Sequence, residues 1–315
     1  MFLKNTINVF ASNFTLTYRL LLYKLIIGVL CIAIGFATVL PLLEPVMLDM
    51  QAAGVLETAS LITQSFADST LFSDTVSAEV LQTVNTVRDI LIYHSSSLFA
   101  IYVAFAFLVI LWYFGSAAID IALCEVIHFF CKQKSRRSLM ACFISRFVEV
   151  CKYTFFKMFI ILPVEICIIA LSVAVYVFNI GGFFSTSIAI LLLFGLYPLK
   201  DVFVACFAPC FICSGKGVFA SFKHGITLSL SKGVKVYSTN LFVMICGAIF
   251  CLMASLVSLG ALTIYAFAIF SVYKKCLSFV IYYNLEGMRF YSDSETIVTP
   301  YIVKVQEGDY TVDLL

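Results

Sequence analysis

An uncharged stretch too long for a single membrane span is the feature that most constrains how this chain can fold. Residues 241–273 include no Asp, Glu, Lys or Arg over 33 positions. As a single helix rising 1.5 Å per residue, this stretch would be roughly 50 Å long, whereas the hydrocarbon core of a bilayer is roughly 30 Å thick. We therefore expect the stretch to turn back near residues 255–260 and to cross a membrane twice.

Composition and the remaining apolar runs extend this interpretation to the whole chain. Hydrophobic residues make up 62% of the sequence and charged residues 12%, and the mean hydropathy is +1.05. A soluble domain carries roughly 25% charged residues, so we expect an all-α integral membrane protein. The sequence predicts spans at residues 25–43, 98–119, 158–178, 183–213, 241–258 and 261–283. A membrane domain over residues 1–283 would precede a cytoplasmic tail over 284–315, where residues 297–305 and 310–314 could pair as strands.

The distribution of basic residues along the chain favours six spans over five. With six spans and a cytoplasmic N-terminus, the outer segments hold one basic residue, Arg88, out of twenty. Five spans would place Lys274, Lys275, Arg289 and Lys304 outside, against the bias that orients membrane proteins. We therefore expect a multi-pass protein of the cell membrane with both termini cytoplasmic, in which Lys274 and Lys275 extend toward the inner head groups.

The outer segment at residues 44–97 has helical periodicity. Its apolar residues form two stripes at helical spacing, Val55, Ala59, Ile62 and Phe66, then Val76, Val80, Val84, Val87 and Leu91. This spacing predicts an extracytoplasmic helical hairpin. The stripes can pack on each other and on the rim of the bundle, or they can bind a partner.

The sequence pattern also indicates three related repeats, each of which consists of an amphipathic segment followed by a helical hairpin. The leading segments are residues 9–24, 139–157 and 218–239, which mix aromatic and aliphatic residues with Lys, Arg and Ser. Such segments suit helices in the inner membrane interface. The second helix of each hairpin becomes polar toward the cytoplasm, at Asp120, Asp201 and Lys274.

Ionisable residues inside spans are candidates for function because they are costly there. Glu165 lies about two turns from the inner end of the third span, and Lys200 and Asp201 lie at comparable depth in the fourth. We expect Glu165 and Lys200 to pair. The cluster then serves either as a structural ion pair or as a proton or substrate relay.

Asp120, Glu125 and His128 follow a span that is already long enough, so we expect them at the cytoplasmic interface. A metal site would need His128 and Cys131 to meet cysteines 206, 210 and 213, but the sequence has no matching Cys-x-x-Cys pairs. We expect no metal, no cofactor and no catalytic residue, because phosphate-binding, dinucleotide-binding and hydrolase signatures are absent from the sequence. The cysteines read as small buried hydrophobes.

In its layout the chain resembles the six-helix bacterial membrane proteins of the glycerophosphodiester phosphodiesterase membrane-domain and YciC-like group. The resemblance rests on an amphipathic segment before each hairpin, on the Phe-Gly pairs at 114–115 and 194–195, and on Pro163, Pro198 and Pro209. It implies the same six-helix fold over residues 1–283. We expect no phosphodiesterase catalytic domain within these 315 residues, so the resemblance implies no catalytic residue here.

Three functional hypotheses follow. The first is a non-enzymatic accessory or scaffold subunit that binds another membrane or envelope component, for which a protein is one possibility. The second is a transporter or permease-like protein whose interrupted helices flank Glu165, Lys200 and Asp201. The third is a lipid-modifying enzyme, which would need Asp120, Glu125 and His128 to converge. The charge balance of +2 gives no reason to expect nucleic acid as a partner.

Overall fold

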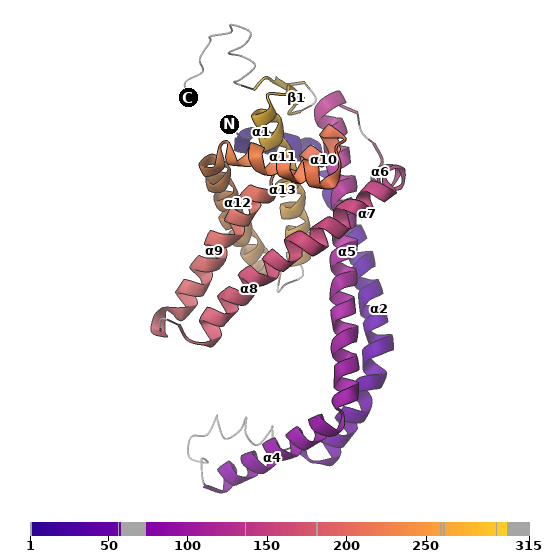
Figure 1. Ribbon diagram of the computed structural model, residues 1–315, viewed down its shortest axis with the longest axis vertical. Helices are drawn as coiled ribbons and strands as arrows, with labels where there is room; N and C mark the ends of the chain where they lie inside the picture. Colours follow the sequence, from indigo (N-terminus) through magenta and orange to yellow (C-terminus); the bar gives the residue numbers. More distant parts are fainter. Residues whose placement is uncertain are drawn as a thin grey trace. The chain divides into compact units, whose positions relative to one another are not determined.

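The computed structural model describes residues 2–55, 57, 74–135, 137–180, 182–258, 260, 262–293 and 295–300. Over these residues the protein is almost entirely helical (Figure 1). Six helices are long and apolar enough to span a membrane, namely Thr15–Ala52, Ser95–Gln133, Phe147–Val177, Ser185–Ser214, Gly233–Val257 and Thr263–Glu286. The prediction of an all-α protein with six potential spans is confirmed.

The individual elements divide the chain more finely than hydropathy does. The α-helices are α1 (Phe2–Ser12), α2 (Thr15–Ala52), α4 (Asp74–Tyr93), α5 (Ser95–Gln133), α6 (Leu139–Ser145), α7 (Phe147–Phe156), α8 (Leu162–Val177), α9 (Ser185–Val204), α10 (Phe207–Ser214), α11 (Val218–Leu230), α12 (Gly233–Val257) and α13 (Thr263–Glu286). A π-helical turn, η1 (Lys157–Ile161), joins α7 to α8, and a 3-10 turn, η2 (Gly182–Phe184), precedes α9. The strands β1 (Phe290–Tyr291) and β2 (Ile297–Val298) pair antiparallel.

Contacts divide the chain into two compact units. The large unit comprises Met1–Leu25 and Phe114–Leu315, and the small unit comprises Ile26–Tyr113. Helices α2 and α5 each contribute residues to both units. The two units are described separately below.

In the small unit, α2 and α5 run side by side (Figure 1). A Cβ added at Gly35 would lie 3.3 Å from a methyl group of Leu108, so the two helices approach closely there. Near the far end, Asp49 Oδ2 lies 2.7 Å from His94 Nε2. The second half of the expected outer hairpin forms α4, whereas most of its first half lies outside the described residues.

In the large unit, α8 pairs with α9 and α12 pairs with α13. The expected turn at residues 255–260 is present between α12 and α13, where Gly260 has φ +94°. Only glycine adopts this conformation without strain. Ser258 Oγ accepts a hydrogen bond of 2.8 Å from the Leu262 N–H, which satisfies a backbone donor next to the start of α13.

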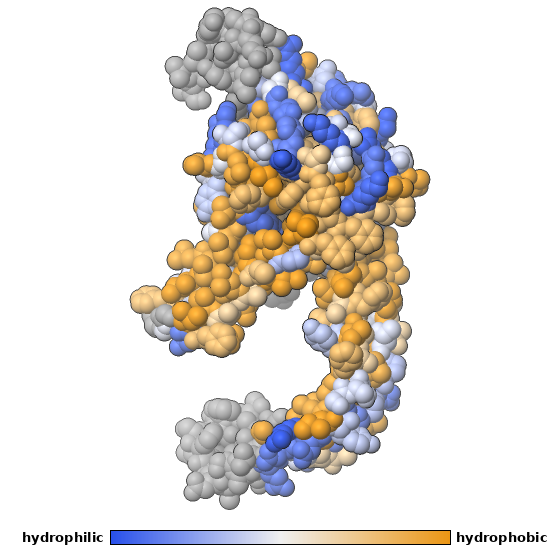
Figure 2. All heavy atoms as spheres, viewed as in Figure 1, coloured by the Kyte–Doolittle hydropathy of each residue, from blue (hydrophilic) through white to orange (hydrophobic). Residues whose placement is uncertain are grey.

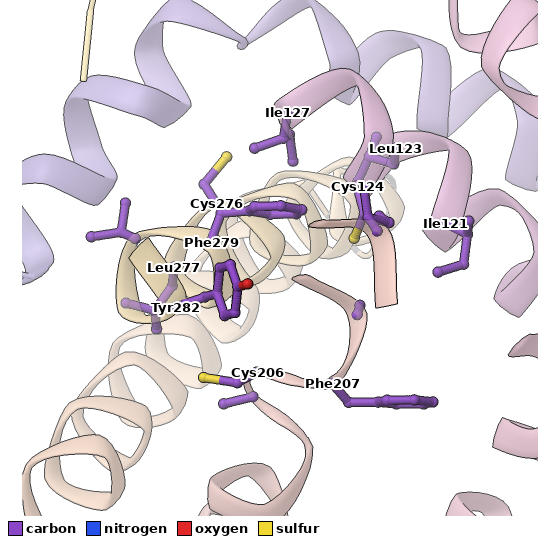
Figure 3. Close-up of a cluster of buried hydrophobic side chains, with 14 of the residues drawn as sticks. Ile121, Leu123, Cys124, Ile127, Cys206, Phe207, Cys276, Leu277, Phe279 and Tyr282 are labelled. Carbon is purple, nitrogen blue, oxygen red and sulfur yellow. The ribbon is translucent and has the colours of Figure 1, made fainter. Parts of the chain in front are cut away.

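The hydrophobic core lies in the large unit, and the second half of α5 forms its centre. Ile121, Leu123 and Ile127 are fully buried there, and they pack among side chains from α13 and from the start of α10 (Figure 3). None of the twelve cysteines forms a disulfide, and seven of them are buried. Buried thiols such as Cys124 and Cys276 pack as small hydrophobes, as the sequence predicted.

Several helices extend beyond the expected spans. Helix α5 continues to Gln133 because the surrounding helices bury its second half, so the helix does not end where its apolar run ends. The fourth potential span, expected as one segment over residues 183–213, is broken at Ala205–Cys206. Residues 297–298 pair with 290–291. Residues 301–315, which include the expected strand at 310–314, lie outside the described part of the chain.

The surface of the large unit is divided between hydrophobic and hydrophilic regions. Figure 2 shows hydrophobic side chains over the α8–α9 hairpin, and hydrophilic residues gathered toward the end where α10 and α11 lie. The exposed side chains of α8 include Ile166, Ile169 and Val173. Such a surface is stable against lipid, and it would be unfavourable in water.

Candidate functional site

The candidate site is a cavity of about 290 Å³ within the large unit. It is lined by residues from α2, α5, α7, η1, α8, α9, α10, α12 and α13, which together represent all three expected repeats. Eight lining residues carry charge: Lys24, Asp120, Lys157, Glu165, Lys200, Asp201, Lys274 and Lys275. Neutral polar side chains complete the lining, namely Ser116, Tyr153, Tyr197, Asn240, Ser271 and Ser278.

Asp120 is the central acceptor on one side of the cavity. Its carboxylate accepts hydrogen bonds from Lys157 Nζ at 2.7 Å and from Lys275 Nζ at 2.9 Å. The residue is only 8% exposed. A carboxylate removed from water in this way is stable only when cations and hydrogen bonds compensate it, and the two ammonium groups supply both.

A second set of ion pairs among the cavity residues involves Glu165, Lys200, Asp201 and Lys274. Lys200 Nζ lies 2.8 Å from Glu165 Oε1 and 3.3 Å from Asp201 Oδ1. Lys274 Nζ lies 2.5 Å from Asp201 Oδ2, so Asp201 bridges two lysines. The Lys200 ammonium also lies 3.8 Å from the centroid of the Tyr197 ring, a distance at which the ring face attracts a cation.

Local irregularities in the helices position these groups. Lys157 begins the π-helical turn η1. In a regular α-helix, the ring of Pro163 would clash with the carbonyl of Phe159, four residues earlier. The wider π-turn relieves this conflict and is often found at functional sites. Lys200 and Asp201 lie in the last turns of α9, just before the helix breaks at Ala205–Cys206.

The cavity carries more positive than negative charge. Five lysines face three carboxylates, which gives a net charge of +2 when all eight groups are ionised. Among the described residues, Lys24 forms no ion pair within 4.0 Å, although it lines the cavity. Excess cations in a site shielded from water attract an anion, and lysine ammonium groups are common ligands of phosphate and carboxylate.

The structure brings the three intramembrane candidates together. Glu165, Lys200 and Asp201 all line the cavity, and the predicted ion pair between Glu165 and Lys200 is confirmed. The expectation that Lys274 and Lys275 extend toward head groups is wrong. Both instead bind carboxylates in the cavity, because Asp201 and Asp120 lie within reach on neighbouring helices.

The expected interfacial cluster is not a single site. Asp120 and Glu125 are buried by the protein, at 8% and 2% exposure, rather than placed at an open interface. Asp120 faces the cavity, whereas Glu125 Oε1 pairs with Arg146 Nε at 3.0 Å. His128 Nδ1 has a different partner, the Tyr283 hydroxyl at 2.7 Å.

His128 and the cysteines gather only in part. Cys213 Sγ lies 3.2 Å from His128 Nδ1, so one of the expected approaches is present. Within the described part of the chain, no three His, Cys, Asp or Glu side chains are arranged to hold a metal ion.

Sequence reasoning missed four of the five cavity lysines as site residues: Lys24, Lys157, Lys274 and Lys275. The three repeats could have indicated some of these residues, because charged side chains occupy corresponding positions in them. Lys24 and Lys157 end the first two leading segments, and Asp120, Asp201 and Lys274 occupy similar places after the Phe-Gly or Phe positions. Two tyrosines add to this similarity, since Tyr23 and Tyr237 donate hydrogen bonds to the carbonyls of Gly115 and Gly195 at 3.3 and 3.4 Å.

Comparison of the chain with protein-family models, with curated proteins and with solved structures finds no match. The resemblance to the YciC-like group therefore stays a prediction. The chemistry of the cavity has to be argued from its own side chains.

Proposed function

We propose that this chain is a transporter or permease-like protein of the cell membrane whose substrate is an anion bound in the charged cavity. The observation that carries the proposal is the excess of five lysines over three carboxylates in that cavity. A purely structural ion-pair network inside a membrane protein would balance its charges, because each uncompensated charge is costly there. An anion of charge −1 or −2 would complete the balance.

The interrupted helices around the cavity support movement of a substrate. The π-turn η1 and the break at Ala205–Cys206 both lie in helices that line the cavity. Discontinuous helices commonly form the substrate sites of transporters, since their irregular backbone can bind ligands and can bend. With both termini cytoplasmic, as the basic residues favour, the cavity would lie toward the inner side of the membrane.

The test is transport by the full chain reconstituted into phosphatidylcholine vesicles. Three probes are followed: radiolabelled inorganic phosphate, radiolabelled glycerol 3-phosphate, and a fluorescent phosphatidic acid that can move between leaflets. We expect at least one probe to move faster than in protein-free vesicles. Lys24→Gln should slow that movement about tenfold, because it removes a cavity charge without breaking an observed ion pair.

Lys232→Gln is the matched control, because Lys232 is exposed and does not line the cavity. It should transport like the unmodified protein. Circular dichroism and gel filtration establish that both variants are folded. If none of the three probes moves, or if the two variants behave alike, the proposal is wrong.

An accessory or scaffold role is the second candidate, and the surface of α4 favours it. In the small unit, Val84, Ile92 and Tyr93 are 57%, 60% and 79% exposed. Exposed apolar side chains on one helix suit a contact with a membrane or envelope protein. Native mass spectrometry of gently extracted protein should then reveal a stoichiometric partner that is lost in Val84→Glu.

The lipid-modifying enzyme is not proposed, because Asp120, Glu125 and His128 have separate partners.

A further inference from the structure

An apolar groove adjoins the charged cavity in the large unit. It has a volume of about 570 Å³ and lies among α8, α9, α12 and α13. Its lining is apolar except for Ser172, Tyr197 and Lys274, and it includes Ile169 and Phe267. Volumes of about 300 to 1,000 Å³ are typical of sites for small ligands.

Two residues belong to both the cavity and the groove. Tyr197 and Lys274 line each of them. The Lys274 ammonium pairs with Asp201 on the cavity side and lies 5.7 and 5.9 Å from the ring centroids of Tyr197 and Phe270. One side chain thus connects a strongly charged region with an apolar one.

A second apolar groove also adjoins the cavity. Its volume is about 330 Å³, and it shares Ile161, Lys200 and Val204 with the cavity. Lys200, like Lys274, is therefore a lysine with ion pairs in the cavity and a place at the edge of an apolar groove. The charged cavity has apolar neighbours at two edges.

We propose that the anion bound by this protein is the head group of a membrane lipid, with its phosphate among the cavity lysines and an acyl chain in the groove between α8, α9, α12 and α13. This inference rests on the proposed anion site. A soluble anion would use the lysines and leave the groove empty, whereas a neutral lipid would use the groove and leave the cavity charge unbalanced. An anionic lipid uses both.

The groove is open to a ligand that arrives through the bilayer. Ile169 and Phe267 are 50% and 56% exposed, so the groove reaches the surface of the large unit. In a membrane, acyl chains surround such a surface. A lipid can therefore enter sideways with its chain in hydrocarbon throughout, and only its head group has to exchange water for lysines.

The test is equilibrium binding of fluorescent phosphatidic acid to the full chain in phosphatidylcholine nanodiscs. Fluorescent phosphatidylcholine is the comparison lipid, and inorganic phosphate and glycerol 3-phosphate are the competitors. We expect phosphatidic acid to bind at least about tenfold more tightly than phosphatidylcholine. Neither soluble competitor should displace it at a concentration that matches that of the lipid.

Two variants test the two halves of the site. Lys24→Gln lowers the cavity charge, and Ala248→Phe places a ring in the groove from an exposed position on α12. Each should weaken phosphatidic acid binding about tenfold. The controls are Lys232→Gln and Val39→Phe, the latter in an apolar groove of the small unit, about 460 Å³ in volume, that has no charged lining residue. Both should bind like the unmodified protein.

The outcomes separate this inference from the proposed function. Equal affinity for the two lipids, or equal effects of Ala248→Phe and Val39→Phe, would overturn lipid binding. If glycerol 3-phosphate displaces the lipid and binds in a way that depends on Lys24 alone, the ligand is a soluble anion. The proposed anion site then stands and the lipid inference fails. If no anionic probe depends on Lys24, both fail.

Discussion

Replacing Asp120 by Asn should destabilise the large unit more than replacing either of its lysine partners. Asp120 is 8% exposed and accepts hydrogen bonds from Lys157 and Lys275. The substitution removes the Asp120 carboxylate from two poorly exposed ammonium groups, and it raises the cavity charge from +2 to +3. Removal of one partner from a buried pair costs about 3–5 kcal/mol, so we expect a loss of about 4 kcal/mol in the free energy of unfolding.

The lysine substitutions should cost less because each leaves Asp120 with one cation. Lys275→Met removes a single charge-assisted hydrogen bond, for which we expect about 2 kcal/mol. The double variant combines Asp120→Asn with Lys275→Met. Because Asp120→Asn alone already deprives Lys275 of its counterion, replacing Lys275 as well adds little to the loss of stability. The double variant should therefore lose about 4 kcal/mol rather than about 6, a coupling of about 2 kcal/mol.

The assay is reversible unfolding in mixed micelles at increasing fractions of sodium dodecyl sulfate, followed by circular dichroism. The three variants and the unmodified protein complete a double-mutant cycle. Strict additivity, or an Asp120→Asn variant as stable as the unmodified protein, would refute the reasoning. In either case the carboxylate would not be the shared counterion of the two lysines.

Two further predictions concern packing and thiol reactivity. Gly247→Ala should lose about 1–3 kcal/mol of unfolding free energy in the same assay, because a Cβ there would overlap the Phe270 ring. Gly233→Ala is the control and should not be destabilised, because a Cβ at Gly233 would lie 3.9 Å from its nearest neighbouring atom. Burial raises the pKa of the Cys142 thiol from its ordinary 9.0 to about 11, so at pH 8 the thiolate is about a hundredfold scarcer. Its carboxymethylation in the folded protein, located by mass spectrometry, should be slower than in the unfolded chain by at least that factor, and equal rates would contradict the burial.

Hydropathy predicted the helices well because a bilayer leaves few alternatives. An uncharged run of 33 residues such as 241–273 has to turn back if it stays in hydrocarbon, and Gly260 in the turn provides the required backbone conformation. The pair Glu165–Lys200 was also predictable. Its members lie at similar depth on consecutive spans, and α8 and α9 form one hairpin.

The other ion pairs could not be predicted from the sequence because they join distant parts of the chain. Asp120 binds a lysine 37 residues away and another 155 residues away, so the pairing depends on how three hairpins pack together. A prediction from hydropathy also ends a span at the first polar residues, whether or not the helix continues. Asp120 and Glu125 were therefore expected at an interface, although the protein itself buries that part of α5. The π-turn at Lys157 has no hydropathy signal.

The distinction between a structural cluster and a binding site depends on the charge balance rather than on the ion pairs. Five ion pairs among the cavity residues connect all three carboxylates to four lysines, and these contacts can be explained by folding alone. Lys24 takes part in none of them, yet it lines the same cavity. Folding gains little from an ammonium that forms no ion pair within 4.0 Å among the described residues, so the presence of Lys24 is explained if an anion joins the cavity after folding. Lys24→Gln should then leave stability unchanged or slightly increased while it weakens ligand binding, and a structural lysine would show the reverse.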